Sequence, residues 1–371
     1  MRLVHVVGVR PNFMKIAPIM SALDRYDEVE QVLVHTGQHY DPEMSQVFFE
    51  HLGIPRPDVN LRMGPDPDGS RTGRMTIELD RVFSELRPAG VVVVGDVNST
   101  MAAALAAVKL GIPCAHVEAG LRSFDRTMPE EVNRVVTDHL ADLLLTPSAD
   151  ADDNLLAEGV PKAAIHRVGN VMIDTLLAHL EEAMQRPTLS LLGVAPGSYA
   201  LATLHRPSNV DDPAMLASRL DTIEWIQERL TVVAPLHPRT RRRLEEFSLL
   251  DRAAAMPNLI LTEPFGYLDF LALTASSKFA LTDSGGLQEE TTSLGIPCLT
   301  VRPCTERPVT VSVGTNTVVG SDAKLLRRTV EDILTGRGKL GAIPELWDGH
   351  AGERAARVLM DHLARISVAG A

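Results

Sequence analysis

The chain has 371 residues, 45% of them hydrophobic and 23% charged, which is the ordinary balance of a globular protein. Its 36 Lys and Arg residues against 48 Asp and Glu residues give a formal net charge of −12, which argues against a general nucleic-acid binder but leaves room for a local basic cleft. The length is too great for one ordinary hydrophobic core and predicts two domains.

The first half of the chain alternates short apolar runs with amphipathic stretches. Four consecutive valines at 91–94 are apolar on both faces, as expected of a central strand in a parallel sheet. Such alternation predicts βαβ units and a doubly wound sheet. The predicted strands span residues 3–7, 31–35, 90–95, 113–117, 143–145 and 164–167, and the predicted helices span 13–24, 42–52, 72–86, 99–110, 130–140 and 149–157.

The same alternation restarts in the second half of the chain. The predicted fold class is therefore α/β, with two Rossmann-like doubly wound domains that face each other across a cleft. We place the junction near residue 169, which predicts domains at 1–169 and 170–352 and an amphipathic helix within the terminal segment 353–371. The predicted strands of the second half span 199–203, 231–235, 259–261, 279–282 and 298–300, and the helices span 213–229, 238–245, 268–275 and 286–294.

Basic residues flank the start of the first predicted helix. Arg10 and Lys15 lie there, with Pro11 at a natural first helical position. Because basic side chains at a helix N-terminus oppose the helix dipole, a bound anion would offset their cost. In a doubly wound sheet, ligands also bind beyond the carboxyl ends of the strands. We therefore interpret Arg10 and Lys15 as phosphate contacts rather than as solvated surface charges.

Two carboxylates follow neighbouring predicted strands. Asp96 comes after the four valines, and Glu118 comes after the next strand along the chain. Burial beside the valines could raise the pKa of Asp96 and make it a poised acid or base. Each carboxylate alone could also be a helix N-cap. The pair favours a catalytic interpretation, because adjacent strand tips share one edge of the sheet.

A glycine pair stands between a strand and a helix in the second half. The segment Ser284-Gly285-Gly286 follows the strand at 279–282, and glycines let a backbone approach an anion closely at a helix N-terminus. Glu290 lies about one turn further on, where it could accept hydrogen bonds from ribose hydroxyls. The segment predicts a nucleotide diphosphate site, and a plain tight turn before a helix is the equal alternative.

Two histidines follow strands of the second half. His205 stands beside Arg206 after the strand at 199–203, and His237 follows the next strand. A lone histidine is usually structural, but at a strand tip His205 is a candidate acid or diphosphate contact. We rank His237 below it.

Six short motifs occur in order along the chain, and together they resemble the non-hydrolysing UDP-N-acetylglucosamine 2-epimerases from Arg2 to about Gly320. The motifs are Gly-Val-Arg-Pro-Asn-Phe-Met-Lys at 8–15, Gly-Asp at 95–96, His-Val-Glu-Ala-Gly-Leu-Arg at 116–122, Pro-Glu-Glu-Val-Asn-Arg at 129–134, His-Arg-Pro at 205–207 and Thr-Glu-Arg-Pro at 305–308.

The resemblance implies a GT-B fold whose last helix packs back on the N-terminal domain. It also lifts Glu130 to a catalytic candidate, whereas Glu131 is interpreted as a local ion-pair partner of Arg134. The catalytic candidates are then Asp96, Glu118, Glu130 and His205. The substrate-binding candidates are Arg10, Lys15, Gln38, His39, His237, Phe270, Ser284, Gly285, Gly286, Glu290 and Arg307, with a second, activating sugar nucleotide implied near Gln38 and His39 and a structural turn as the alternative there.

The predicted activity is a 2-epimerase that interconverts UDP-N-acetylglucosamine and UDP-N-acetylmannosamine, or a close acetamido-sugar relative, by elimination of UDP to a glycal and re-addition. The alternatives are a GT-B glycosyltransferase that uses a UDP-sugar donor, a hydrolysing 2-epimerase and a nucleotide-sugar sensor. Asn12 and Val309 stand where many family members carry glutamate, and Arg71 stands where glutamine is usual. These departures concern substrate detail and the activating site more than the type of reaction.

No cofactor and no metal are expected, because the first strand lacks a GxGxxG motif and the chain lacks a cluster with metal-ligand spacing. The three cysteines, Cys114, Cys298 and Cys304, fit a reducing cytoplasm, and no signal-peptide layout or membrane-spanning stretch is present. The expected partners are the UDP-sugar and, from the resemblance, a second copy of the chain in a homodimer, with neither nucleic acid nor membrane.

Overall fold

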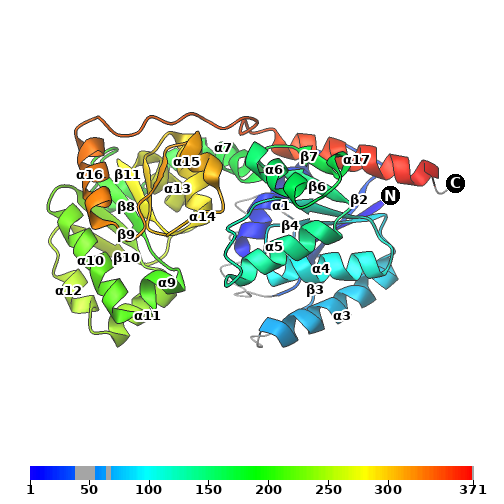
Figure 1. Ribbon diagram of the computed structural model, residues 1–371, viewed down its shortest axis with the longest axis horizontal. Coiled ribbons are helices and arrows are strands. Elements are labelled where there is room, and N and C mark those ends of the chain that lie inside the picture. Colours follow the sequence, from blue (N-terminus) through cyan, green and yellow to red (C-terminus); the bar gives the residue numbers. More distant parts are fainter. Residues whose placement is uncertain (38–54, 64–67, 370–371) are drawn as a thin grey trace. The chain divides into compact units, whose positions relative to one another are not determined.

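Figure 1 shows the computed structural model, which describes residues 1–37, 55–63 and 68–369. The chain divides into two compact units. The first comprises Met1–Thr175 together with Glu345–Ala371, and the second comprises Leu176–Pro344. The predicted helix at 42–52 lies outside the described residues, as do the candidates Gln38 and His39.

The first unit is built on a seven-stranded parallel sheet in the order β3-β2-β1-β4-β5-β6-β7. The order reverses at β1 and β4, which pair with each other, and ligands bind at such a switch point in doubly wound sheets. All four valines of β4 are buried, as predicted for a central strand. The strands are β1 (Arg2–Val7), β2 (Glu30–His35), β3 (Val59–Asn60), β4 (Gly90–Val94), β5 (Cys114–Val117), β6 (Leu143–Thr146) and β7 (Ile165–Arg167).

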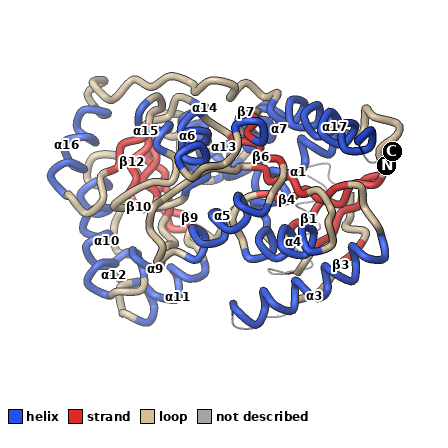
Figure 2. Tube along the Cα trace, turned by 45° about the vertical axis from the view of Figure 1, so that its right-hand side comes forward, coloured by secondary structure: helices blue, strands red, loops and turns tan. Residues whose placement is uncertain are grey.

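Helices cover both faces of this sheet (Figure 2). The right-handed crossover from β1 to β2 places α1 on one face of the sheet. The crossovers from β3 to β4, β4 to β5 and β5 to β6 run the other way along the sheet and place α3, α4 and α5 on the opposite face, where α4 packs against both α3 and α5. The helices are α1 (Arg10–Leu23), α3 (Asp68–Leu86), α4 (Asn98–Lys109), α5 (Pro129–Leu140), α6 (Ala149–Ala157) and α7 (Val171–Met184), the last of which crosses the unit boundary.

The C-terminal helix α17 (Ala351–Ala369) belongs to the first unit and packs against α1. Asp174 caps its first turn by accepting hydrogen bonds from the backbone N–H groups of Ala351 (3.1 Å) and Gly352 (2.6 Å). Gly352 permits the close approach to α1, since a Cβ there would lie 2.7 Å from the backbone of Pro18.

The second unit is built on a six-stranded parallel sheet in the order β10-β9-β8-β11-β12-β13. Its strands are β8 (Tyr199–Thr203), β9 (Thr231–Pro235), β10 (Leu259–Thr262), β11 (Phe279–Thr282), β12 (Cys298–Thr300) and β13 (Asn316–Val318). Its helices are α8 (Thr188–Leu191), α9 (Pro207–Val210), α10 (Pro213–Gln227), α11 (Pro238–Glu246), α12 (Leu250–Ala254), α13 (Tyr267–Ser276), α14 (Gly285–Leu294), α15 (Pro308–Ser312) and α16 (Ala323–Leu334). In the described parts of the chain, no helix has both the length and the apolar character needed to cross a membrane.

Candidate active site

The loop from β1 to α1 is tied to the tip of β4 by Asn12. The Asn12 Oδ1 atom accepts hydrogen bonds from the backbone N–H groups of Gly8 (3.0 Å) and Val9 (3.1 Å), and its Nδ2 atom donates to the carbonyl of Val94 (3.0 Å). These bonds fix the start of α1 at Arg10 instead of residue 13. A glutamate could not donate to Val94, so the departure at Asn12 has a structural role here. The side chain of Arg10 is outside the part of the structure that is described.

Glu118 and Lys15 form a buried ion pair at this edge of the sheet. Their side chains are 7% and 8% exposed, and Lys15 Nζ contacts Glu118 Oε2 directly. Gly95 leaves room for the pair, because a Cβ on it would lie 3.0 Å from Lys15 Nζ. Glu118 also adopts a left-handed φ of 69°, which is costly for a residue other than glycine and is typical of functional sites.

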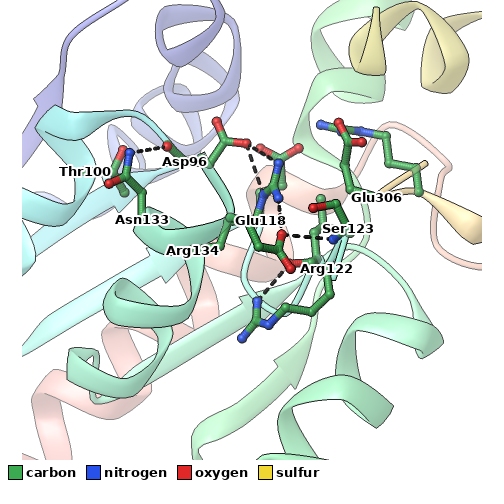
Figure 3. Close-up of polar contacts among 12 residues, drawn as sticks. Asp96, Thr100, Glu118, Arg122, Ser123, Asn133, Arg134 and Glu306 are labelled. Atoms are coloured by element: carbon green, nitrogen blue, oxygen red, sulfur yellow. Dashed lines mark hydrogen bonds and ion pairs between the residues drawn. The ribbon is translucent and has the colours of Figure 1, made fainter. Parts of the chain in front are cut away.

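Asp96 follows β4 and is held by Arg134 from α5. Both Nη2 (2.7 Å) and Nε (3.1 Å) of Arg134 donate to Asp96 Oδ2, so the guanidinium stabilises the ionised carboxylate. Figure 3 shows the two side chains pointing toward each other. The predicted ion pair between Arg134 and Glu131 is confirmed, with an Nη1–Oε2 distance of 2.5 Å. Glu131 in turn accepts the backbone N–H groups of Ser123 and Phe124.

Glu130 lies in the first turn of α5 and is half-buried. Within the described residues, its carboxylate has neither a hydrogen bond nor an ion pair, unlike Asp96 and Glu118. It is thus available to a ligand or to a proton-transfer step.

A network of buried hydrogen bonds lies beneath the carboxyl ends of β4 and β5, inside the protein. His116 bridges the carbonyl of Gly95 (Nε2, 2.8 Å) and Asp138 Oδ1 (Nδ1, 2.6 Å). Asp138 also accepts the N–H of Gly120 (3.1 Å) and Nη1 of Arg122 (2.7 Å). Burial tends to raise the pKa of Asp138, but the charges and hydrogen bonds of His116 and Arg122 lower it on balance. The network therefore fixes the backbone before Glu118, at His116, and after it, at Gly120.

In the second unit, His205 and Asp283 follow the paired strands β8 and β11. Their Nδ1 and Oδ1 atoms lie 2.8 Å apart. His237, at the tip of the next strand, has its ring centroid 5.5 Å from that of His205. Burial first, and then the charge of His205, lowers the pKa of His237. Both predicted histidines thus lie together at one edge of this sheet.

The Ser-Gly-Gly segment precedes a helix as predicted, and α14 starts at Gly285, one residue before the predicted start. A Cβ on Gly285 would lie 2.5 Å from Arg307 Nη1 and 2.8 Å from Glu306 Oε1, whereas a Cβ on Gly286 would meet nothing within 4 Å. The two glycines therefore have different roles. Gly285 makes room for a buried arginine, and Gly286 leaves the backbone open to an incoming anion.

Arg307 is buried beside this helix start and has two carboxylate partners. Its Nε atom lies 2.9 Å from Glu289 Oε1, and its Nη1 atom lies 2.7 Å from Glu306 Oε1. A second guanidinium, that of Arg302, lies 2.8 Å from Glu306 Oε2. The two guanidiniums and the two carboxylates balance in charge, so what favours an anion here is the N-terminus of α14, with its helix dipole and free backbone N–H groups.

Glu290 is buried one turn into α14. Burial first, and then the charge of Glu289, raises the pKa of Glu290 to about 8. The nearby Tyr267 hydroxyl is buried without a hydrogen-bond partner in the described part of the chain. Burial raises the pKa of Tyr267, and so does the charge of Glu290. Phe270, by contrast, is half-buried and packs on the hydrophobic cluster around Leu201 and Leu273.

Four residues that complete these sites were missed in the sequence: Arg134 as a partner of Asp96, the pair His116 and Asp138, and Asp283. Asp283 had a usable signal, because it follows a predicted strand as His205 does. The pairing of Asp96 with Arg134 had none, since the two residues are 38 positions apart and on different elements. Among the described residues, no group of three or more His, Cys, Asp or Glu side chains has the geometry to hold a metal ion.

Comparison with known proteins decides the family. The family described as UDP-N-acetylglucosamine 2-epimerase matches residues 21–360. The chain belongs to the UDP-N-acetylglucosamine 2-epimerase family. The resemblance predicted from the six motifs is confirmed, and so is the prediction of an epimerase.

Sequence relatives and solved structures of the same family are similar to this protein over nearly the whole chain. UDP-N-acetylglucosamine 2-epimerase of Methanocaldococcus jannaschii is 42% identical over 364 residues, which cover 97% of this chain and 99% of the relative. UDP-2,3-diacetamido-2,3-dideoxy-D-glucuronate 2-epimerase of Pseudomonas aeruginosa is 40% identical over 370 residues, which cover 99% of this chain and all of the relative (100%).

The crystal structure of the M. jannaschii enzyme with UDP-GlcNAc and UDP gives a TM-score of 0.90 at 41% identity, over 97% of this chain and 100% of that one. The fold is thus of GT-B type, as predicted. A lipopolysaccharide outer core galactosyltransferase is similar at a TM-score of 0.56 and 14% identity, over 98% of this chain and 100% of that one, which shows a shared fold alone.

Proposed function

We propose that the protein is a non-hydrolysing 2-epimerase that interconverts UDP-N-acetylglucosamine and UDP-N-acetylmannosamine. The observation that carries this proposal is the 42% identity to an enzyme of that name over 99% of its length. Asp96, Glu118 and Glu130 all lie on one unit, after β4, after β5 and in the first turn of α5, which supports the proposal, since epimerisation needs more than one proton-transfer group. A glycosyltransferase would need a single base.

The proposed reaction begins when a base of the protein takes the hydrogen from C2 of the sugar. The C1–O bond then breaks, its electron pair leaves with UDP, and a C1–C2 double bond forms in the glycal. UDP returns to C1 while C2 receives a proton from the opposite face. No step of this reaction changes the oxidation state overall, so the acids and bases of the chain are sufficient to carry it out.

We assign proton transfer to Asp96, Glu118, Glu130 and His205. Lys15 sets the charge environment of Glu118. Ser284, Gly285 and Gly286 at the start of α14, with Arg307 beside them, would stabilise the departing diphosphate, and Glu290 would bind ribose. Arg10, Lys15, Gln38, His39, His237 and Phe270 remain proposed substrate contacts from the sequence.

A proton NMR assay of the anomeric signals tests the activity on two substrates, UDP-N-acetylglucosamine and UDP-2,3-diacetamido-2,3-dideoxyglucuronate. We expect the first to equilibrate with its 2-epimer and the second to react more slowly. Asp96→Asn keeps the shape of the side chain and should lower turnover by about 100- to 10,000-fold. The exposed Asp80 on α3 provides the matched control, and Asp80→Asn should leave turnover unchanged.

A faster reaction of the uronate would reassign the substrate but keep the reaction. Absence of turnover on both sugars, with UDP bound tightly, would favour a sensor over an enzyme. From the family resemblance we also propose that the protein is cytoplasmic and forms a homodimer. Sedimentation of the purified protein tests the homodimer directly.

A further inference from the structure

Asp283 is a fully buried carboxylate that faces only hydrogen-bond donors. Its Oδ2 atom accepts from the backbone N–H groups of Arg206 (2.9 Å) and His205 (3.0 Å) and from Asn209 Nδ2 (2.9 Å). Its Oδ1 atom faces the backbone N–H of His205 (3.1 Å) and His205 Nδ1 (2.8 Å). Burial tends to raise the pKa of Asp283, but the His205 contact and the other hydrogen bonds lower it on balance.

The amide orientation of Asn209 is fixed by a residue behind it. Arg219 Nε lies 2.9 Å from Asn209 Oδ1, and a guanidinium can only donate, so that atom must be the oxygen. The amide nitrogen of Asn209 therefore points at Asp283 Oδ2 and at the carbonyl of Val301 (3.1 Å). Arg219 is itself anchored by the carbonyl of Gly320 (3.0 Å).

We propose that Asp283 is the positioning residue of His205: it holds the neutral ring as the Nδ1–H tautomer, so that Nε2 is the atom presented to substrate. Only this tautomer can donate to the ionised carboxylate. The side chain of His205 is 35% exposed while that of Asp283 is fully buried, which leaves the ring edge opposite Asp283 for a ligand. The inference rests on the proposed function in one respect, namely that His205 transfers a proton.

His237 has the opposite arrangement. Its Nδ1 atom accepts a hydrogen bond from the backbone N–H of Arg239 (3.2 Å), so a neutral His237 carries its proton on Nε2. The two neighbouring rings thus present an acceptor from His205 and a donor from His237. His237 also serves as an internal reference for the tautomer, because its Nδ1 partner is the backbone of Arg239, whereas Asp283 acts on this ring through its charge, which raises the pKa of His237 against the larger lowering by burial.

In Asp283→Asn, the surrounding donors determine both the orientation of the new amide and the tautomer of His205. Three donors converge on the Oδ2 position, so the amide oxygen of the new side chain must lie there and its NH₂ group must face His205 Nδ1. The ring can meet that donor only as an acceptor, which moves its proton to Nε2. The variant then lacks a base at Nε2, and it cannot support the imidazolium form either. Inversion of the histidine tautomer is known to remove most proton-transfer catalysis.

The test is nitrogen-15 NMR of the full-length protein labelled at histidine, with His205 assigned by its loss in His205→Gln and the spectra taken at a pH where the rings are neutral. We expect Nδ1–H for His205 and Nε2–H for His237 in the unaltered protein. In Asp283→Asn, His205 should change to Nε2–H while His237 stays as it is. Detection of Nε2–H on His205 in the unaltered protein would overturn the inference even if the variant fails to fold.

Turnover of UDP-N-acetylglucosamine gives the second readout. Asp283→Asn should reduce kcat by about 100- to 10,000-fold, the range that one proton-transfer group contributes, with UDP affinity retained. Asp211→Asn, a carboxylate-to-amide change at a surface ion pair with Arg239 and Arg243, should keep kcat and both tautomers. Unchanged kcat in a folded Asp283→Asn variant with an inverted tautomer would contradict the positioning role. Correct tautomers without any turnover in the unaltered protein would instead count against the proposed function alone.

Discussion

At the residue scale, several charged groups of the candidate site, Asp96 and Glu118 among them, have counter-charges that come from distant elements. Lys15 reaches Glu118 across 103 positions of sequence, and the pair is nearly excluded from water. Desolvating two such charges is expensive, and each one is tolerated only because the other is present. The pair is therefore weak evidence for stability as a whole, although the loss of either partner would be costly.

A double-mutant cycle on Lys15→Met and Glu118→Gln measures this dependence. Each single change strands one buried partner and should lower the free energy of unfolding by on the order of 3 kcal/mol. The double variant should lose less than the sum, by at least about 1 kcal/mol. Urea unfolding gives the values. The exposed pair Glu78 and Arg81 on α3 is the matched control, with an expected coupling below about 0.5 kcal/mol. Additive losses at Lys15 and Glu118 would show that the contact is not a coupled pair.

The raised pKa of Glu290, about 8, predicts a pH dependence of stability in the ligand-free protein. In the unfolded chain a glutamate has a pKa near about 4.3, so between these values the folded state holds a proton that the unfolded state has lost. The contribution of this proton to folding is complete at acidic pH and disappears as the pH rises through about 8. The unaltered protein should thus lose stability relative to Glu290→Gln between about pH 5 and pH 8, by at most about 1.4 kcal/mol per pH unit.

Chemical denaturation at several pH values checks the difference. Glu245→Gln, at an exposed position on α11, should track the unaltered protein throughout. A constant difference between Glu290→Gln and the unaltered protein would mean that Glu290 is ionised in both states.

At the element scale, the two adjacent glycines at the N-terminus of α14 have different roles: Gly285 makes room for Arg307, and Gly286 leaves the backbone open to a ligand. In Gly285→Ala the new methyl group would overlap the Arg307 guanidinium, so Arg307 and Glu306 must move; we expect a loss of about 1–3 kcal/mol. Gly286→Ala meets open space inside a helix, where alanine is favoured by about 0.5–1 kcal/mol. Thermal unfolding should therefore shift down for the first variant and stay level or rise for the second. Equal effects of the two changes would show that the contact with Arg307 does not constrain Gly285.

At the scale of the whole molecule, the parallel sheets and the strand-tip positions followed from the sequence because burial and crossover geometry act on every residue of a strand. The four valines of β4 and the placement of Asp96 after them are examples. Short edge strands were missed, since Asn316–Val318 carries no apolar run. Helix α16 was also missed, although Leu326, Val330 and Ile333 recur at helical spacing and are buried.

The partners of the site residues could not be predicted, because they depend on where side chains from separate elements meet. Arg134 on Asp96 and Glu289 on Arg307 both arise in this way. Family resemblance supplied the identity of Glu130, which no local rule distinguishes from an ordinary acidic residue at a helix start.

The most direct test of the account is conversion of UDP-N-acetylglucosamine in heavy water, followed by proton NMR. Elimination and re-addition predict that the 2-epimer carries deuterium at C2, with only traces of free UDP and glycal. A hydrolysing enzyme would release UDP in amounts equal to the product, and a glycosyltransferase would leave the C2 hydrogen in place without epimerising the sugar. Epimerisation with the original C2 hydrogen retained would contradict the elimination mechanism.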